Sequence, residues 1–506
     1  MTPALRRLFT STAAAALACC AVPAWAQEPA GAQAIPTANT APVGVSQEQF
    51  LALIARLDSL EARNEELEQQ ILDLKTVGAA NVQGVRDQLN AQPTVTVNNA
   101  RPQVATADGR FKFALRSVVQ FDAAHYNVSP RTAAADLGSG TNFRRARLGF
   151  DGTAFKDWNY ALWGEFGGSG GESATLNQAY IEYAGFKPFG LEEPLRVRIG
   201  AWATPAGLED ATSNTESLFL ERAAVAELVR NFATGDGRTG VGATLRGPRW
   251  YASALFSGKV VGTPATAEFD QQSGYAVRVA FNPIKGQDYD VHVGANLQSI
   301  LNPADTTGGP VSARAVRLQE RPELRVSGLR LVDTGALNSD GLTAYGLEGG
   351  ASFKNFYAAG EWYKIDVNRQ GASPFDPSFS GWYVQGAWTI TGERHAWSNA
   401  NGGFTGVKPA KTFDRSKGTW GALEVAARYS VLDLNDRAGV FRAAAPAGGV
   451  RGGEQKVTTV GLNWYPNNTV RFLLDYQWIR VDRLNAAGAS LDTDVDVVSL
   501  RSQFAF

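Results

Sequence analysis

The amino-acid sequence predicts an all-β fold: a sixteen-stranded antiparallel transmembrane β-barrel, preceded by a short N-terminal α-helical coiled coil. Three observations lead to this prediction. The chain begins with an export signal, and sixteen segments of about ten residues between positions 109 and 506 alternate apolar and polar side chains. Short and long connections alternate between these segments. A strand of about ten residues crosses a bilayer when tilted, and bacterial single-chain barrels have an even number of strands.

Residues 1–26 have the pattern of a secretory signal peptide. Arg6 and Arg7 supply the positive start, an apolar run reaches Val22, and the sequence A-W-A ends at Ala26. A charged start, an apolar middle and small residues at the cleavage site are the features by which such signals are recognised. The mature protein is therefore predicted to be exported.

Composition excludes several classes of protein. The formal net charge of the 506 residues is −1, so no bulk charge favours nucleic acid as a partner. The only two cysteines, Cys19 and Cys20, lie inside the signal, so the mature chain is expected to use no disulfide and no cysteine metal site. No cofactor is expected either. After the signal no stretch of about 18 consecutive apolar residues occurs, as a membrane-spanning helix requires.

A linker at 27–45, rich in Ala, Pro and Gln, leads to a heptad pattern at 46–77. Apolar residues occupy position d, and position a is apolar apart from Asn64, whose usual role is to fix register and oligomeric state. The pattern predicts a coiled coil; a single amphipathic helix packed on a core is the weaker alternative, because charged residues crowd the other positions. Residues 78–108 lose the heptads and are predicted to be a second linker.

The domain at 109–506 has two kinds of strand face. In the first strand Phe111, Phe113 and Leu115 share one side, while Lys112 and Arg116 share the other. Outward apolar and inward polar residues are expected of a membrane barrel, as are Trp and Tyr at strand ends. The chain ends in a phenylalanine, Phe506, as outer-membrane strands often do. One connection, at 392–417, is long although its place in the order predicts a short periplasmic turn.

The stretch TNFRRARLGF, at 141–150, carries three arginines in one strand. Alternation directs Arg145 and Arg147 into the lumen and puts Arg144 on the other side, at the strand's external start, where it is expected to turn toward the loops. Cations in a pore wall lower the energy of a passing anion. The alternative is that these arginines pair with carboxylates such as Glu165 and only brace the wall. The other strand cations expected in the lumen are Lys112, Arg116, Arg196, Arg198 and Arg278.

Two long loops, at 204–238 and 300–340, are expected to narrow the pore. The first contains Arg222 and Arg230, and the second has arginines spaced every three to five residues. Folded inward, this second set would form a ladder of cations; an exposed basic loop is the alternative. The ladder comprises Arg314, Arg317, Arg321, Arg325 and Arg330.

No constellation of catalytic residues is apparent. His125, His292 and His395 are far apart in the strand order and have no evident nucleophile beside them. The sequence therefore predicts a protein that is not an enzyme. An outer-membrane hydrolase and a soluble secreted β-protein that binds a ligand are the alternatives.

Several motifs resemble those of the phosphate- and pyrophosphate-selective porins of Gram-negative outer membranes, over residues 109–506. They are FRRARLGFDGTAFKDWNY, LNQAYIEYAG, LFLERA, WTITGERHAW, GALEVAARYSVLDLND and GLNWYPNNTVRFLLDYQW. The resemblance implies a homotrimer of sixteen-stranded barrels with an arginine- and lysine-lined constriction. By position it assigns Arg144 and Arg145 to the constriction, Arg222 and Arg230 to its third loop, and Arg314 to Arg330 to the ladder of its fifth loop. Gln178 and the absence of lysine from the third loop depart from the family pattern and argue against strict phosphate selectivity.

The sequence thus predicts an outer-membrane porin, surrounded by outer-membrane lipid, through which phosphate, pyrophosphate or organic anions diffuse passively. A general, weakly selective porin is the alternative. The coiled coil would stand in the periplasm, where it could also contact peptidoglycan.

Overall fold

The computed structural model of the chain describes residues 44, 46–132, 135–168, 175–263, 269–305, 307, 313–371 and 373–506. The predicted signal at 1–26 and all but Gly44 of the linker at 27–45 lie outside these residues. The chain divides into two units, Met1–Val85 and Arg86–Phe506, which are described separately. No helix of the described residues is both long and apolar enough to cross a bilayer.

The predicted helix is present as α1 (Gln47–Ala91), and none of its residues is buried. It runs 14 residues past the predicted end at residue 77, so the linker predicted from residue 78 is wrong over this part. Gly78 and Gly84 each cost roughly 1 kcal/mol in a helix, which is too little to end it. The end comes where Pro93 restricts the preceding residue to extended backbone.

The rest of that predicted linker forms a hairpin. Strands β1 (Thr94–Asn98) and β2 (Arg101–Ala105) pair antiparallel around Asn99 and Ala100, which both have positive φ angles, as tight hairpin turns require. β2 also pairs with the start of β3, with Gln103 opposite Ala114. The hairpin therefore extends the barrel sheet at one end.

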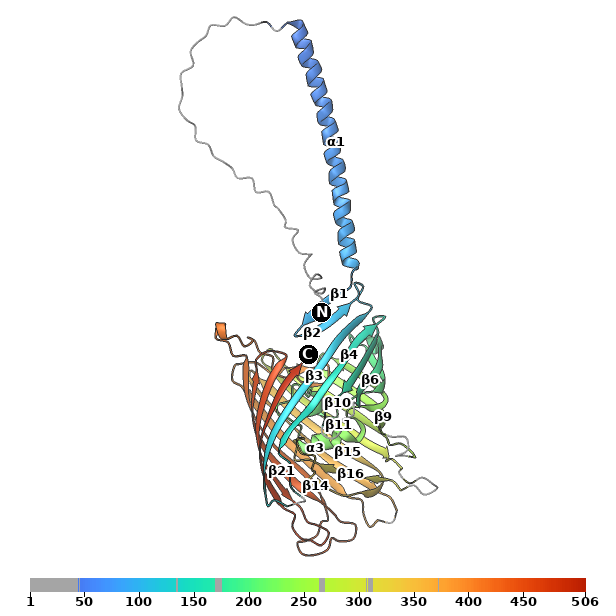
Figure 1. Ribbon diagram of the computed structural model, residues 1–506. Coiled ribbons are helices and arrows are strands. Elements are labelled where there is room, and N and C mark those ends of the chain that lie inside the picture. The colour runs from blue at the N-terminus through green and yellow to red at the C-terminus, as the bar shows by residue number, and fades with distance from the viewer. Residues whose placement is uncertain are drawn as a thin grey trace, which may run out of the picture. The chain divides into compact units, whose positions relative to one another are not determined.

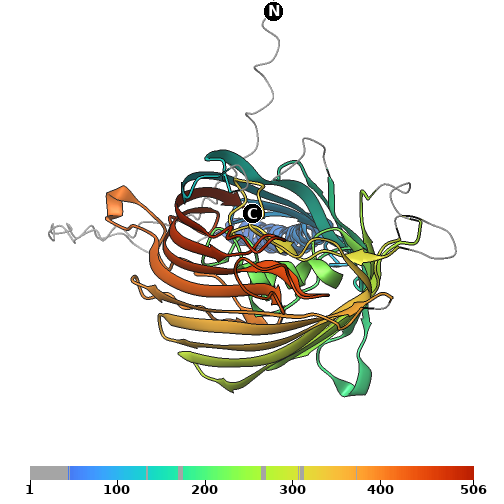
Figure 2. The ribbon, with the colours of Figure 1, turned by 90° about the horizontal axis from the view of Figure 1, so that it is seen from below.

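Sixteen long strands form a closed antiparallel barrel (Figures 1 and 2), which confirms the predicted barrel. Each strand pairs with its neighbours in sequence, and the last closes on the first, with Gln503 opposite Gln120. The strands are β3 (Lys112–Ser129), β4 (Gly140–Ala154), β5 (Trp158–Glu165), β6 (Thr175–Phe186), β7 (Leu195–Ala201), β8 (Arg238–Gly247), β9 (Trp250–Val260), β10 (Ser273–Lys285), β11 (Tyr289–Asn302), β15 (Leu337–Phe353), β16 (Phe356–Arg369), β17 (Ser378–Thr389), β20 (Ala422–Asp436), β21 (Val450–Tyr465), β22 (Val470–Asp482) and β23 (Thr493–Ala505).

Short elements occupy the connections. They are η1 (Pro188–Gly190), α2 (Leu208–Ala211), α3 (Ala224–Ala233), β12 (Ala315–Val316), β13 (Gln319–Glu320), β14 (Val332–Asp333), β18 (Trp397–Ser398), β19 (Gly403–Phe404) and η2 (Arg415–Lys417).

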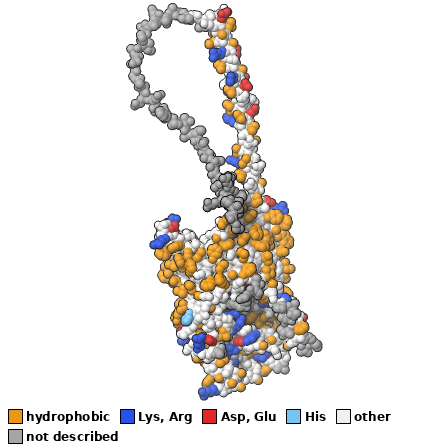
Figure 3. Space-filling view, in the orientation of Figure 1, with side chains coloured by type: hydrophobic (Ala, Val, Ile, Leu, Met, Phe, Trp, Pro, Cys, Tyr) orange, Lys and Arg blue, Asp and Glu red, His pale blue; other side chains and the backbone are white. Residues whose placement is uncertain are grey.

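The outer wall is apolar, as the alternation predicts. Leu148, Ile199, Leu347 and Val384 point outward and are exposed, and in Figure 3 apolar side chains gather in a band over the upper part of the barrel wall. Burying this surface in lipid is the main favourable term for a membrane barrel.

The interior of the barrel contains more apolar side chains than an alternation of outward apolar and inward polar residues predicts. Helix α3 lies inside the ring of strands (Figure 2) and contacts β10, β11, β17 and β20. Its Val225 and Val229 join one apolar core with inward-facing Ile365 and Phe379 of the wall and with Leu318 from the connection between β11 and β15. Described parts of both long loops therefore pack inside the barrel.

The unusually long connection between β17 and β20 also enters the lumen. Arg278 donates to the carbonyl oxygens of Asn401 and Gly402, at 2.7 Å each, and Thr212 donates to that of Phe404 at 3.0 Å. Segments from opposite ends of the barrel thus meet inside it.

Candidate pore-lining site

A β-bulge in β4 determines the direction in which Arg144 and Arg145 point. Phe121 pairs with Phe143, but the next pair is Gln120 with Arg145, so Arg144 is an extra residue. The bulge turns Arg144 inward beside Arg145, and both are buried. The parity argument that placed Arg144 on the outer side is therefore wrong, because alternation fails across an inserted residue.

Arg144 begins a continuous chain of ion pairs. It pairs with Glu221 of the loop between β7 and β8 at 2.6 Å, and Glu221 also binds Arg501 of the last strand at 2.8 Å. Arg501 in turn pairs with Asp122 at 2.7 Å. The network ties strands β3, β4 and β23 to the loop.

The same chain continues through the loops to β5. Its further pairs are Arg325 with Glu221 at 3.7 Å and Glu227 at 2.5 Å, Arg222 with Glu227 at 3.3 Å and Asp210 at 2.9 Å, Arg230 with Asp210 and Asp236 at 2.6 Å each, and Arg147 with Asp236 at 2.7 Å and Glu165 at 2.5 Å. Six arginines face six carboxylates in this chain, so when all are ionised its net charge is zero.

Arg145 is not part of this neutral chain of ion pairs. It is 3% exposed, and its Nη1 donates to the Gln120 side chain at 2.6 Å. Its Nε has no hydrogen-bond partner, and no carboxylate of the described residues lies within ion-pair distance of it. Arg145 therefore adds one uncompensated positive charge to a neutral frame.

Glu227 and Glu221 of the network are held in their ionised form. Burial raises the pKa of Glu227, but Arg325, Arg230 and Arg222 outweigh this and lower it to about 2. For Glu221 burial is likewise outweighed, by Arg144 and Arg501, and its pKa falls well below the usual range. Nearby opposite charges favour the ionised form of a carboxyl group.

The arginines of the ladder predicted in the loop between β11 and β15 do not all lie in the same surroundings. Arg325 joins the network, and Arg321 is buried above it with no carboxylate of the described residues in ion-pair distance. Burial, together with the charges of Arg325 and Arg330, lowers the pKa of Arg321 to about 10. Arg314 pairs with Asp270 at 3.6 Å, and Arg317 pairs with Asp333. The side chain of Arg317 is more than half exposed. Arg314 and Arg317 therefore lie outside the buried part of the ladder.

The remaining strand cations lie near the end of the barrel with short turns. Arg196 and Arg198 both bind Glu182, at 3.0 and 2.6 Å, and Arg116 binds Asp151 at 2.8 Å. Arg196, Arg198 and Lys112 line a cavity of about 270 Å³, together with Asp151 and Glu182. These arginines and Arg147 thus pair with carboxylates, and the cations that were predicted to form a single belt lie in two groups.

Some lumen arginines were missed by the sequence reasoning. Arg501 and Arg471 lie on strands whose alternation would have placed them inward, but no cluster of basic residues drew attention to them. Arg428 binds Glu209 at 2.9 Å and also Glu323, which joins the wall to both loops. Arg101 comes from the hairpin in the predicted linker, where no lumen residue was expected.

The chain is similar to porins. The sequence model described as phosphate-selective porin O and P matches residues 111–506. Porin O of Pseudomonas aeruginosa is 26% identical over 415 residues, which cover 80% of this chain and 90% of that protein. An uncharacterised protein of Caulobacter vibrioides is 27% identical over 428 residues, covering 79% of this chain and 77% of its own.

Among solved structures, OmpT of Vibrio cholerae is 10% identical with a TM-score of 0.47, and covers 78% of this chain and 98% of its own. An anion-selective porin from Comamonas acidovorans is 13% identical with a TM-score of 0.42, over 78% of this chain and all of its own.

The family match spans the whole closed barrel, from its first strand to Phe506. This chain belongs to the phosphate-selective porin O and P family and is an outer-membrane porin.

Proposed function

We propose that this chain forms a water-filled channel through which small anions diffuse in preference to cations, past a constriction lined by Arg145. The observation that carries the proposal is the uncompensated charge of Arg145 beside a neutral network. At an effective dielectric constant near 20, a unit charge about 4 Å from an anion contributes roughly 4 kcal/mol before desolvation. That attraction offsets part of the hydration that an anion loses in a narrow path.

The network supports this role by holding the constriction open at a fixed width. Arginines paired on both sides, such as Arg147 and Arg230, have little freedom to move into the path. Arg321 continues the unpaired positive charge toward the external side. A few separated cations make shallow sites that an anion leaves easily, which passive diffusion requires.

The proposed solutes are phosphate, pyrophosphate and small organic anions, all of which match the planar fork of arginine. The general, weakly selective porin is the second candidate, favoured by the many carboxylates that neutralise the other arginines. The two candidates differ in the reversal potential they produce in a salt gradient.

The test is the reversal potential of planar bilayers under a KCl gradient. The wild-type channel should be anion-selective, and Arg145→Gln should lose most of that selectivity while remaining folded, as seen by heat-modifiable electrophoresis. Lys456→Gln is the control, because Lys456 lies on the outer face of β21 and pairs with Glu454. A wild-type reversal potential near zero would support the general porin instead.

The same proposal includes a homotrimer joined by α1. Apolar heptad residues such as Leu53, Leu60 and Leu67 are exposed along α1, and a long helix with such a seam is stabilised by packing against copies of itself. Removing residues 46–77 should weaken assembly without changing single-channel selectivity. A native mass of one chain for the intact protein would contradict the trimer. Contact of α1 with peptidoglycan is a further proposal, which a pull-down with isolated sacculi tests.

A further inference from the structure

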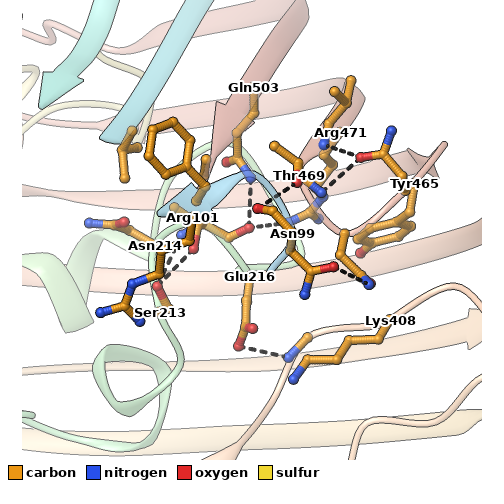
Figure 4. Close-up of a pocket in the computed structure, with 18 of the residues that line it drawn as sticks. Asn99, Arg101, Ser213, Asn214, Glu216, Lys408, Tyr465, Thr469, Arg471 and Gln503 are labelled. Carbon is orange, nitrogen blue, oxygen red and sulfur yellow. Dashed lines mark hydrogen bonds between the residues drawn. The ribbon is translucent and has the colours of Figure 1, made fainter. Parts of the chain in front are cut away.

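The connection between β17 and β20 leaves the lumen again before it reaches β20. Residues 406–408 line a cavity of about 360 Å³ inside the barrel (Figure 4), where Glu216 accepts a hydrogen bond from the backbone of Gly406 at 3.1 Å. Residues 411–420 then form a hairpin that includes η2 and stands out sideways from the barrel, in orange in Figures 1 and 2. One connection thus has a part inside the barrel and a part outside it.

Aromatic rings attach the base of the 411–420 hairpin to the lipid-facing wall. The centre of the Phe413 ring lies 5.7 Å from that of Trp420 and 5.7 Å from that of Trp464. Trp464 shares the outward face of β21 with the exposed Leu462 and stacks on Phe472 at 5.4 Å. Trp420 is 66% exposed. An exposed indole at the edge of an apolar wall is typical of the boundary between hydrocarbon and lipid headgroups.

The rest of the 411–420 hairpin is cationic. Lys411, Arg415 and Lys417 are exposed, and Asp414 is the single carboxylate in these ten residues. Asp414 pairs with Lys417 at 3.0 Å, whereas neither Lys411 nor Arg415 forms an ion pair with any described residue. The hairpin therefore presents two uncompensated positive charges to its surroundings.

Hydrogen bonds define the shape of the hairpin tip. The backbone N–H groups of Asp414 and Thr419 each donate to the other residue's carbonyl oxygen, at 3.0 and 3.1 Å. The Asp414 carboxylate accepts from the backbone N–H of Ser416 at 2.9 Å. Gly418 completes the turn with a φ of 66°, which glycine adopts without the steric cost that other residues meet. The cations are thus carried on a hydrogen-bonded turn.

The order of these groups matches that of a phospholipid surface. The apolar wall comes first, the rings of Phe413 and Trp420 follow, and Lys411 and Arg415 carry charge beside them. In Figure 3 Lys and Arg side chains gather at the upper left, directly above the apolar band. Hydrocarbon, headgroup boundary and lipid phosphate follow one another in the same order across a leaflet. The short-turn end of such a barrel faces the periplasm, so the nearest lipid lies in the inner, phospholipid leaflet.

We propose that the 411–420 hairpin binds an anionic phospholipid of the inner leaflet. Lys411 and Arg415 attract its headgroup, and Trp420 packs beside its acyl chains. Phosphatidylglycerol keeps the net negative charge of its phosphate, whereas the ammonium group of phosphatidylethanolamine offsets that charge. The site therefore prefers the anionic lipid. It lies outside the lumen and is independent of the ion selectivity proposed above.

The test is native mass spectrometry of the intact, detergent-purified protein, titrated with dioleoylphosphatidylglycerol or dioleoylphosphatidylethanolamine. The wild type should bind phosphatidylglycerol more tightly. Each cation near an anionic lipid surface strengthens binding about fivefold, so Lys411→Gln combined with Arg415→Gln should weaken phosphatidylglycerol binding roughly 25-fold. Binding of phosphatidylethanolamine should be nearly unchanged in this double variant.

Lys364→Gln combined with Arg480→Gln is the matched control. It also removes two exposed cations from the outer wall, but toward the opposite end of β16 and β22 from the short turns. Phosphatidylglycerol binding should stay at the wild-type level. Trp420→Ala should weaken the binding of both lipids by a similar factor, because an indole packs on acyl chains whatever the charge of the headgroup.

Equal affinity of the wild type for the two lipids would overturn the proposal. So would unchanged phosphatidylglycerol binding in the Lys411 and Arg415 double variant, or an equal loss in the control. A double variant that keeps this affinity but no longer binds isolated sacculi would assign the hairpin to the cell wall instead. If the wild type shows no anion selectivity in KCl while lipid binding depends on Lys411 and Arg415, the proposed function fails and the lipid site stands.

Discussion

Two sides of the lumen differ in their side chains: one is apolar and the other is charged. On one side, Val225 and Val229 of α3 pack against inward-facing aliphatic residues of the wall. On the other, Glu227 and Arg230 of the same helix enter the chain of ion pairs that reaches β4 and β23. Apolar packing holds the helix in place, but it is a non-directional interaction. The ion pairs have a defined geometry, so they determine which side chains line the open side and how these are oriented. One helix therefore both fills the closed half and shapes the open half.

The largest expected effect comes from breaking the apolar side. Val225 is fully buried and lies against Gly381, where a side chain on the strand would collide with it. Val225→Asp places an unpaired charge in the apolar core, at a cost of several kcal/mol, and should expel the loop from the lumen. We expect higher single-channel conductance and little ion selectivity, with the barrel still folded.

Val440→Asp is the matched control for that variant, since Val440 is 69% exposed. Wild-type conductance in the Val225 variant would show that the charged side alone holds the loop.

A smaller effect should separate the two neighbouring arginines of the charged side. Arg147→Ala leaves Glu165 and Asp236 without their shared partner, and breaking a buried ion pair from one side costs about 3–5 kcal/mol. The unfolding temperature should fall and selectivity should shift toward cations. Arg145→Ala removes a charge that has no carboxylate partner, so it should lower anion selectivity with little loss of stability.

Thermal shift of the heat-modifiable band and the reversal potential, measured on both variants, test this contrast. Equal losses of stability would mean that Arg145 braces the wall as Arg147 does.

The smallest expected effect is a pH dependence within the loops. Burial raises the pKa of Glu320 to about 7, although Arg325 opposes the shift. Below pH 7 Glu320 is therefore protonated and neutral, and above it the residue adds a negative charge near Arg321. Anion selectivity should rise modestly as the pH falls from 8 to 6.

Glu320→Gln should reduce this slope without abolishing it, because burial also raises the pKa of Glu209 to about 7. Reversal potentials that are the same at pH 6 and pH 8 in the wild type would contradict the assignment.

Period-two alternation was enough to predict the barrel, because each wall strand has to present one face to lipid. It was not enough for the interior. Ile365 and Phe379 face inward but are apolar, so their strands have apolar residues on both faces. The reason is that α3 packs against them inside the barrel. The pairing of Arg147 with Glu165 was foreseen as an alternative, since the two lie on neighbouring strands. The contacts of Arg144 and Arg325 with Glu221 depend on how a loop folds, which local pattern does not encode.

The bulge at Arg144 adds one residue to the strand without changing the face to which the residues after it point. One added residue gives the pore a second consecutive inward arginine, while Arg147 and every outward residue after it keep their places. Deleting that single position would restore plain alternation and remove one cation from the lumen without disturbing the lipid-facing wall. Relatives of this porin could therefore gain or lose lumen charges in steps of one residue, leaving the barrel unchanged.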